Sequence, residues 1–192
     1  MKPRFVRDPL GAEGMSANGV NLDALVPRGD FAMGEGANIV EAPGDEKLSL
    51  AHFGSPFFTG VLRKPEFQRE TLHWPPQKVV DLVAAFLDRR LIPAVILWRA
   101  GNFNFVVDGA HRISALFAWI CNDYGDGDRS KRLFGAVLPP EQIEIANKAR
   151  KLMHKQIGPY DLYKAGVDHP GAVDELTKRR ISNLSVAHMV AQ

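Results

Sequence analysis

The chain has 192 residues, of which 24 are lysine or arginine and 22 are aspartate or glutamate, so its formal net charge is only +2. This balance excludes a protein that binds nucleic acid over its whole surface. An apolar fraction of 45% excludes a chain that is disordered throughout. The single cysteine, Cys121, excludes an internal disulfide framework and a cysteine-based zinc site. Because no apolar run reaches the ~20 residues of a membrane span and no secretory signal begins the chain, we expect a cytoplasmic protein without a membrane partner.

The two ends of the chain differ in composition. Residues 1–62 have five basic and eight acidic side chains and nine of the seventeen glycines, a density of glycine that disfavours long helices and strands. We therefore expect residues 1–50 to be a poorly ordered leader. Residues 129–192 have 11 basic and 6 acidic side chains, which places a net charge of +5 at the C-terminal end.

Regular elements are expected from residue 57 onward. Residues 57–62 are rich in β-prone side chains and predict a short strand. Two prolines at positions 75 and 76 then precede residues 77–90, in which apolar side chains recur at helical spacing. Because proline is tolerated in a first helical turn, this pattern predicts an amphipathic helix.

A strand hairpin and a second helix follow. Residues 94–98 form an apolar run typical of a strand buried on both faces. An Ala-Gly-Asn turn connects this run to residues 103–107, which predict the second strand of a hairpin. Residues 111–122 again have apolar side chains at a spacing of 3.6 and predict a helix.

Helices dominate the C-terminal third. Pro139 and Pro140 precede a predicted helix that ends near Gln156, and weaker helical segments follow it. Since apolar residues lie close to the last residue, we expect residues 136–192 to be a helical extension truncated from a longer protein.

The most informative segment connects the second hairpin strand to the helix that follows it. Asp108 ends the strand, Gly109 lets the backbone turn, and the first amide groups of the helix favour an anion. His111 and Arg112 add hydrogen-bond donors, of which the planar guanidinium suits phosphate. Asp108 would repel a phosphate unless it binds a cation such as Mg²⁺ or acts as a base. The segment therefore favours a nucleotide or phosphate site.

The same segment also has a purely structural interpretation. Aspartate at a junction between strand and helix is a common helix cap, and the following glycine then only relieves the turn. Arg112 would in that case be an ordinary surface charge. Spacing alone does not separate the two interpretations.

The chain contains, in order, Phe67-Gln68-Arg69-Glu70, Trp74, a predicted helix, Leu91-Ile92-Pro93, two predicted strands and the motif Asp108-Gly109-Ala110-His111-Arg112. This order of elements resembles that of the ParB/sulfiredoxin-like superfamily. The nearest resemblance is to the N-terminal domain of GmrSD-type restriction enzymes, whose motif is D-G-Q-Q-R. The resemblance covers residues 57–125.

This resemblance implies a fold and a function. The fold is an α+β domain, residues 51–135, in which helices flank a small, mostly antiparallel sheet. The function is binding, and in some members hydrolysis, of a nucleoside triphosphate with Mg²⁺, in chromosome segregation or antiphage defence. Ala110 replaces a glutamine of the family motif, which leaves binding better supported than hydrolysis. Carried over by position, the catalytic residues are Asp108, His111 and Arg112, with Asp108 also the metal ligand, and the nucleotide-binding residues are Gln68, Arg69, Gly109 and Arg112.

Other interpretations stay open. The alternative function is a DNA-binding or DNA-cleaving module without nucleotide turnover, which would use basic side chains of the predicted helix 140–156 and a C-terminal nuclease or helical partner domain. An ordinary solvated helix face explains the same charges. Likewise, the polar loop 122–128 is either a cation site or a solvated loop, and Trp74 is either a core residue or a stacking surface for a base. The basic residues concerned are Lys148, Arg150, Lys151 and Lys155.

Overall fold

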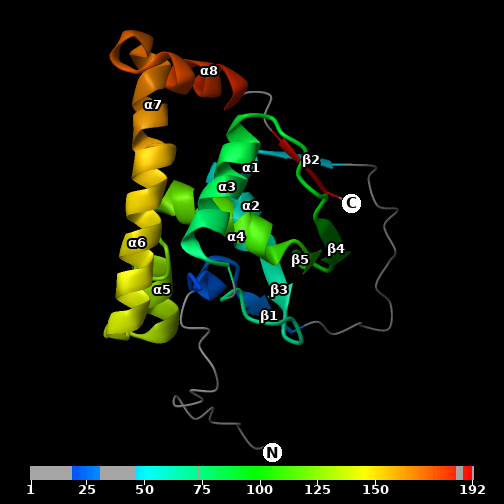
Figure 1. Ribbon diagram of the computed structural model, residues 1–192. Helices are drawn as coiled ribbons and strands as arrows, with labels where there is room; N and C mark the ends of the chain where they lie inside the picture. Colours follow the sequence, from blue (N-terminus) through cyan, green and yellow to red (C-terminus); the bar gives the residue numbers. More distant parts are fainter. Residues whose placement is uncertain (1–18, 31–45, 73, 185–187, 192) are drawn as a thin grey trace, which may run out of the picture.

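The computed structural model describes residues 19–30, 46–72, 74–184 and 188–191 (Figure 1). The N-terminal half contains η1 (Asp23–Leu25), β1 (Arg28–Gly29), β2 (Glu46–Ser49), α1 (Leu50–Gly54), α2 (Pro56–Val61), β3 (Leu62–Pro65) and α3 (Pro76–Leu87). The C-terminal half contains β4 (Ile96–Ala100), β5 (Phe103–Asp108), α4 (Ala110–Cys121), α5 (Asp128–Phe134), α6 (Pro140–Gln156), α7 (Tyr160–Asp168), η2 (Pro170–Ala172), α8 (Glu175–Leu184) and β6 (His188–Ala191). The α+β class expected from the sequence is confirmed.

The main sheet is mixed, so the expectation of a mostly antiparallel sheet is wrong. Its strand order is β1-β3-β5-β4, with parallel pairing of β1 to β3 and of β3 to β5, and antiparallel pairing only between β4 and β5. The parallel pairing arises because the chain passes through α3 between β3 and the hairpin. A separate antiparallel ribbon joins β2 to β6.

Residues 57–61 are helical, which corrects the strand predicted over 57–62. Ser55 caps α2 by accepting a hydrogen bond from the Phe58 amide at 3.5 Å, and Pro56 occupies the first turn. These start signals outweigh the β-propensity of the phenylalanines because Phe58 also gains an edge-to-face contact with Phe53, with centroids 6.1 Å apart. The strand begins only at Leu62.

The hairpin and the periodic helices agree with the sequence within a few residues, with one correction. The strand predicted over 94–98 begins at Ile96, and it is the edge strand of the sheet rather than a strand buried on both faces. Ile96 and Trp98 on this strand are both exposed. A strand with an apolar sequence therefore lies at the protein surface.

The prediction of a poorly ordered leader is wrong for residues 19–30 and 46–50. Val20, Leu22 and Leu25 are buried in the main core, and the Leu22 amide donates a hydrogen bond to the Thr71 carbonyl at 3.0 Å. Glycine density over the whole segment concealed this short apolar stretch. Residues 1–18 and 31–45, which the same prediction covered, lie outside the described residues.

A buried ion pair holds this N-terminal segment to the sheet. Lys64, fully buried on β3, donates to the Asp23 carboxylate and to the Thr71 hydroxyl at 3.3 Å, and Arg28 pairs with Asp23 at 3.4 Å. Burial by itself would raise the pKa of Asp23, but the Lys64 ammonium, the Thr71 amide and Arg28 outweigh burial and lower it. Burial lowers the pKa of Lys64. The cluster fixes the start of the loop that follows β3.

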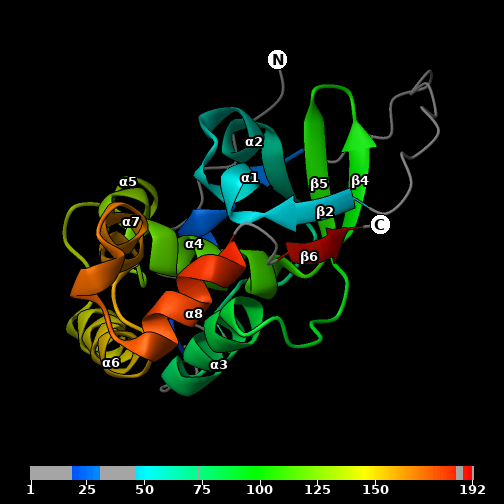
Figure 2. The same cartoon turned by 90° about the horizontal axis from the view of Figure 1, so that it is seen from above.

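The C-terminal helices pack on the same core rather than forming a separate extension. Arg180 of α8 donates to the Asp88 carboxylate at 2.8 Å, and Gln156 of α6 exchanges hydrogen bonds with Gln77 of α3. The segment also ends in a strand, β6, and not in a helix. In both views α6 lies on the opposite side of the molecule from the β4–β5 hairpin (Figures 1 and 2). Across the described ranges, no helix is long and apolar enough to span a membrane.

Candidate functional site

The start of α4 is built around Gly109. This residue has φ 96° and ψ 12°, and it is the N-cap of the helix. A Cβ atom here would lie 2.4 Å from Cγ1 of Val95, so both the backbone conformation and the packing require glycine. Glycine also has no side chain with which to cap the first amides of α4. These amides have no partner inside the helix and form its positive end.

Arg112 folds back over this turn. Its Nη2 donates to the Asp108 carboxylate at 2.6 Å and to the Ala94 carbonyl at 2.9 Å. The absence of a side chain at Gly109 permits this path, because a Cβ atom there would be 3.1 Å from Nη2. The Arg112 side chain is 17% exposed and that of Asp108 is 61% exposed. A guanidinium therefore lies beside the positive end of a helix, with one solvated carboxylate as its counterion.

Gln68 reaches the same place from the loop after β3. Its side-chain amide donates to the carbonyl of Val107, the residue before Asp108. Arg28 holds this loop by donating to the Gln68 carbonyl at 2.8 Å. The structure thus brings Gln68 together with the motif, as expected. Arg69 is exposed and makes no hydrogen bond or ion pair with the described residues, so its predicted contact with phosphate stays a prediction.

Three buried polar atoms in the loop after β3 and in the first two turns of α4 make no hydrogen bond within the described part of the chain. They are Oε1 of Gln68, Nε of Arg112 and Oγ of Ser114. Each such atom costs about 1–3 kcal/mol unless water or a ligand satisfies it. Ser114 was missed at the sequence level, although a serine between the apolar positions Ile113 and Leu116 of a buried helix was a usable signal.

Aromatic contacts fix the ring of His111. It stacks on Trp74, with ring centroids 5.4 Å apart and an interplanar angle of 22°. Nζ of Lys78 lies 4.6 Å from the centroid of the same tryptophan ring. Trp74 is half-buried and packs against the core, yet it also borders the start of α4. The interpretation of Trp74 as a core residue therefore has support, and its stacking on a base stays a prediction.

No family model, no curated protein and no solved structure matches this chain.

The residues of this site suit a metal ion only if a bound ligand supplies further groups to coordinate it. No cluster of three or more histidine, cysteine, aspartate or glutamate side chains suited to a metal occurs in the described ranges. Asp108 offers one solvated carboxylate. Mg²⁺ is commonly held by one or two carboxylates together with the phosphates of its substrate, so Asp108 fits a cation that a nucleotide brings.

The sequence predicts that the loop 122–128 is either a cation site or a solvated loop. Its buried carboxylate is hydrogen-bonded by donors of the protein itself. The Asp123 carboxylate accepts from the amides of Gly125, Gly127 and Ser130 and, at 2.6 Å, from the Ser130 hydroxyl. Burial alone would raise the pKa of Asp123, but these donors lower it. The carboxylate therefore organises the loop between α4 and α5.

The basic residues of α6 differ in their contacts. Arg150 pairs with Asp126 at 2.5 Å, whereas Lys148, Lys151 and Lys155 are exposed. Nothing in these contacts distinguishes a DNA-binding face from a solvated helix face, and the prediction stays open.

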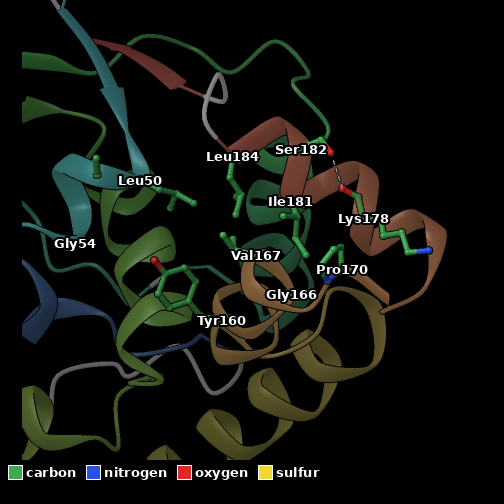
Figure 3. A pocket seen from close by; sticks show the side chains of 11 residues that line it. Leu50, Gly54, Tyr160, Gly166, Val167, Pro170, Lys178, Ile181, Ser182 and Leu184 are labelled. Atoms are coloured by element: carbon green, nitrogen blue, oxygen red, sulfur yellow. Dashed lines mark hydrogen bonds between the residues drawn. The ribbon is translucent and has the colours of Figure 1, made fainter. Parts of the chain in front are cut away.

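A cavity of about 750 Å³ lies elsewhere, between α1, α7 and α8 (Figure 3). Leu50, Val167, Ile181 and Leu184 are among its lining residues, and none of the predicted site residues lines it. The Tyr160 hydroxyl points into this space (Figure 3). A cavity with such an apolar lining does not suit a triphosphate.

Proposed function

We propose that the start of α4 binds the phosphate groups of a nucleoside triphosphate with Mg²⁺, as the resemblance to the ParB/GmrSD type implies. The observation that carries this proposal is the unsatisfied buried Nε of Arg112 beside a helix start that has no side-chain cap. A polyanion placed there would accept hydrogen bonds from the helix amides and from Arg112.

Each residue has a distinct role in this proposal. Arg112 and the first amides of α4 neutralise phosphate charge, and Asp108 exchanges its contact with Arg112 for a contact with Mg²⁺. An exposed ion pair contributes at most about 1 kcal/mol, so this exchange costs little. His111, held by Trp74, donates a proton or a hydrogen bond, and Gln68 orients the motif through Val107.

The proposed main activity is nucleotide binding and not hydrolysis. The family glutamine that would orient an attacking water is alanine at position 110. We therefore propose a module that holds or senses the nucleotide, with slow hydrolysis as the lesser activity. A place in a DNA-related or antiphage system follows from the resemblance alone.

Calorimetric titration tests the proposal. ATP, GTP, CTP and UTP are each titrated with Mg²⁺ into the wild type, Arg112→Ala and the control Arg179→Ala, which removes an exposed arginine of α8. Loss of a charge-assisted contact worth about 1.5–3 kcal/mol should weaken binding by about 10- to 150-fold in Arg112→Ala and leave Arg179→Ala unchanged. No heat with any of the four nucleotides, or equal affinity of Arg112→Ala and the wild type, contradicts the proposal.

A further inference from the structure

The outward face of the β4–β5 hairpin presents a row of aromatic rings. Trp98 lies opposite Phe105 in the strand register, and Phe103 lies two residues before Phe105 on the same strand, so all three share one face. Trp98 is 44% exposed and Phe103 is 39% exposed, while Phe105 between them is buried. The rings of Phe103 and Phe105 meet edge to face, with centroids 6.3 Å apart. We call the exposed rings of Trp98 and Phe103 the aromatic platform.

One arginine adjoins the aromatic platform. The charged side chains of β3, β4 and β5 are Arg63, Lys64, Arg99 and Asp108. Lys64 is buried with Asp23, and Asp108 is paired with Arg112. Arg63 lies opposite Phe105 in the strand register, on the face of the platform, and its Cζ is 4.4 Å from the centroid of the Phe103 ring. Arg99 lies opposite Asn104 and therefore projects from the other face of the sheet. The platform thus combines aromatic rings with one guanidinium.

The spacing of the two rings matches successive stacked groups. Trp98 and Phe103 are diagonal neighbours across an antiparallel pair, a relation that places side chains about 7–8 Å apart. Adjacent bases of an extended single strand span such a separation. Bases in a duplex keep their faces inside the stack, so aromatic rings on a sheet reach them only in a single strand. Charge complementarity with Arg63 favours the phosphates of such a strand over an apolar protein surface.

We propose that the aromatic platform binds single-stranded nucleic acid, with bases stacked on Trp98 and Phe103 and a phosphate held by Arg63. The platform is distinct from the nucleotide site, since it uses the outward face of the sheet whereas that site uses the start of α4. A variant that loses nucleotide binding can therefore still be tested for oligonucleotide binding, and the reverse also holds.

Fluorescence anisotropy with a labelled oligothymidine of about twelve nucleotides tests this assignment. Removal of one stacking ring in Trp98→Ala or Phe103→Ala should weaken binding by about 5- to 150-fold. The matched control is Phe57→Ala, which removes an 81% exposed aromatic ring from α2 and should leave binding unchanged. Arg63→Ala should reduce the slope of log affinity against log salt by about one, whereas Arg99→Ala, on the opposite face of the sheet, should leave the slope unchanged.

Several results would overturn the assignment. These are absence of binding by the wild type, equal loss in Phe57→Ala, or equal competition by duplex of the same sequence. A change of oligomeric state in Trp98→Ala without any change in oligonucleotide affinity would identify the platform as a protein interface instead. Thermal unfolding of each variant shows whether the fold is retained. If a ring variant unfolds, Arg63→Ala keeps the test decisive, because unchanged affinity and salt slope in that variant would also contradict the assignment.

Discussion

Replacement of Gly109 by alanine should destabilise the protein far more than the same change at Gly101. At φ 96° an L-residue pays about 1–2 kcal/mol for the left-handed backbone. The new Cβ atom would also lie 2.4 Å from Cγ1 and 2.9 Å from Cβ of Val95, a fully buried residue whose Cβ cannot rotate away. Such overpacking costs about 1–3 kcal/mol, so the total expected loss in the free energy of unfolding is about 2–5 kcal/mol.

Gly101 separates the two contributions. It also has a positive φ, 56°, but no atom lies within 4 Å of a Cβ built there. Gly101→Ala should therefore lose only the backbone contribution, about 1–2 kcal/mol. Urea unfolding of both variants beside the wild type measures the difference. Equal losses in the two variants would refute the close approach of Val95 and, with it, the described path of Arg112 over the start of α4.

Two further variants test the electrostatics. Asp123→Asn should lower the free energy of unfolding by about 1–3 kcal/mol at neutral pH. Because the pKa of Asp123 in the folded protein lies below its ordinary value of 3.8, the wild type should lose this stability as the pH falls below about 4. The free energies of unfolding of the wild type and Asp123→Asn should therefore converge at low pH. A difference between them that does not change with pH, measured by urea unfolding, would contradict this account. Asp108→Asn should bind inorganic pyrophosphate more tightly than the wild type without Mg²⁺ and more weakly with it, since Asp108 competes for Arg112 in the first case and holds the cation in the second. Calorimetry showing the same change under both conditions would exclude that dual role.

The sequence predicted the elements whose signals are local. Helical spacing identified α3, α4 and α6, and the turn at Gly101 identified the hairpin. Signals that depend on tertiary structure were missed. Leu22 and Leu25 become core residues only through contacts with distant segments, and the parallel pairing of β3 with β5 depends on how the chain crosses the sheet.

The candidate site shows the same division. Asp108, Gly109 and Arg112 lie together because they are adjacent in sequence, and Gln68 joins them through Val107. The stacking of His111 on Trp74 required two segments to meet, which spacing alone could not reveal. The hydrogen bond from Arg112 to the Ala94 carbonyl likewise depends on the fold.

The most direct test of the central claim is a titration of isotopically labelled protein with a nonhydrolysable nucleoside triphosphate and Mg²⁺, followed by backbone amide chemical shifts. If the start of α4 binds the phosphates, the largest shifts will belong to the amides of Ala110, His111 and Arg112, and the Gln68 side-chain amide will shift with them. Unchanged resonances at these positions while amides elsewhere respond would contradict the account.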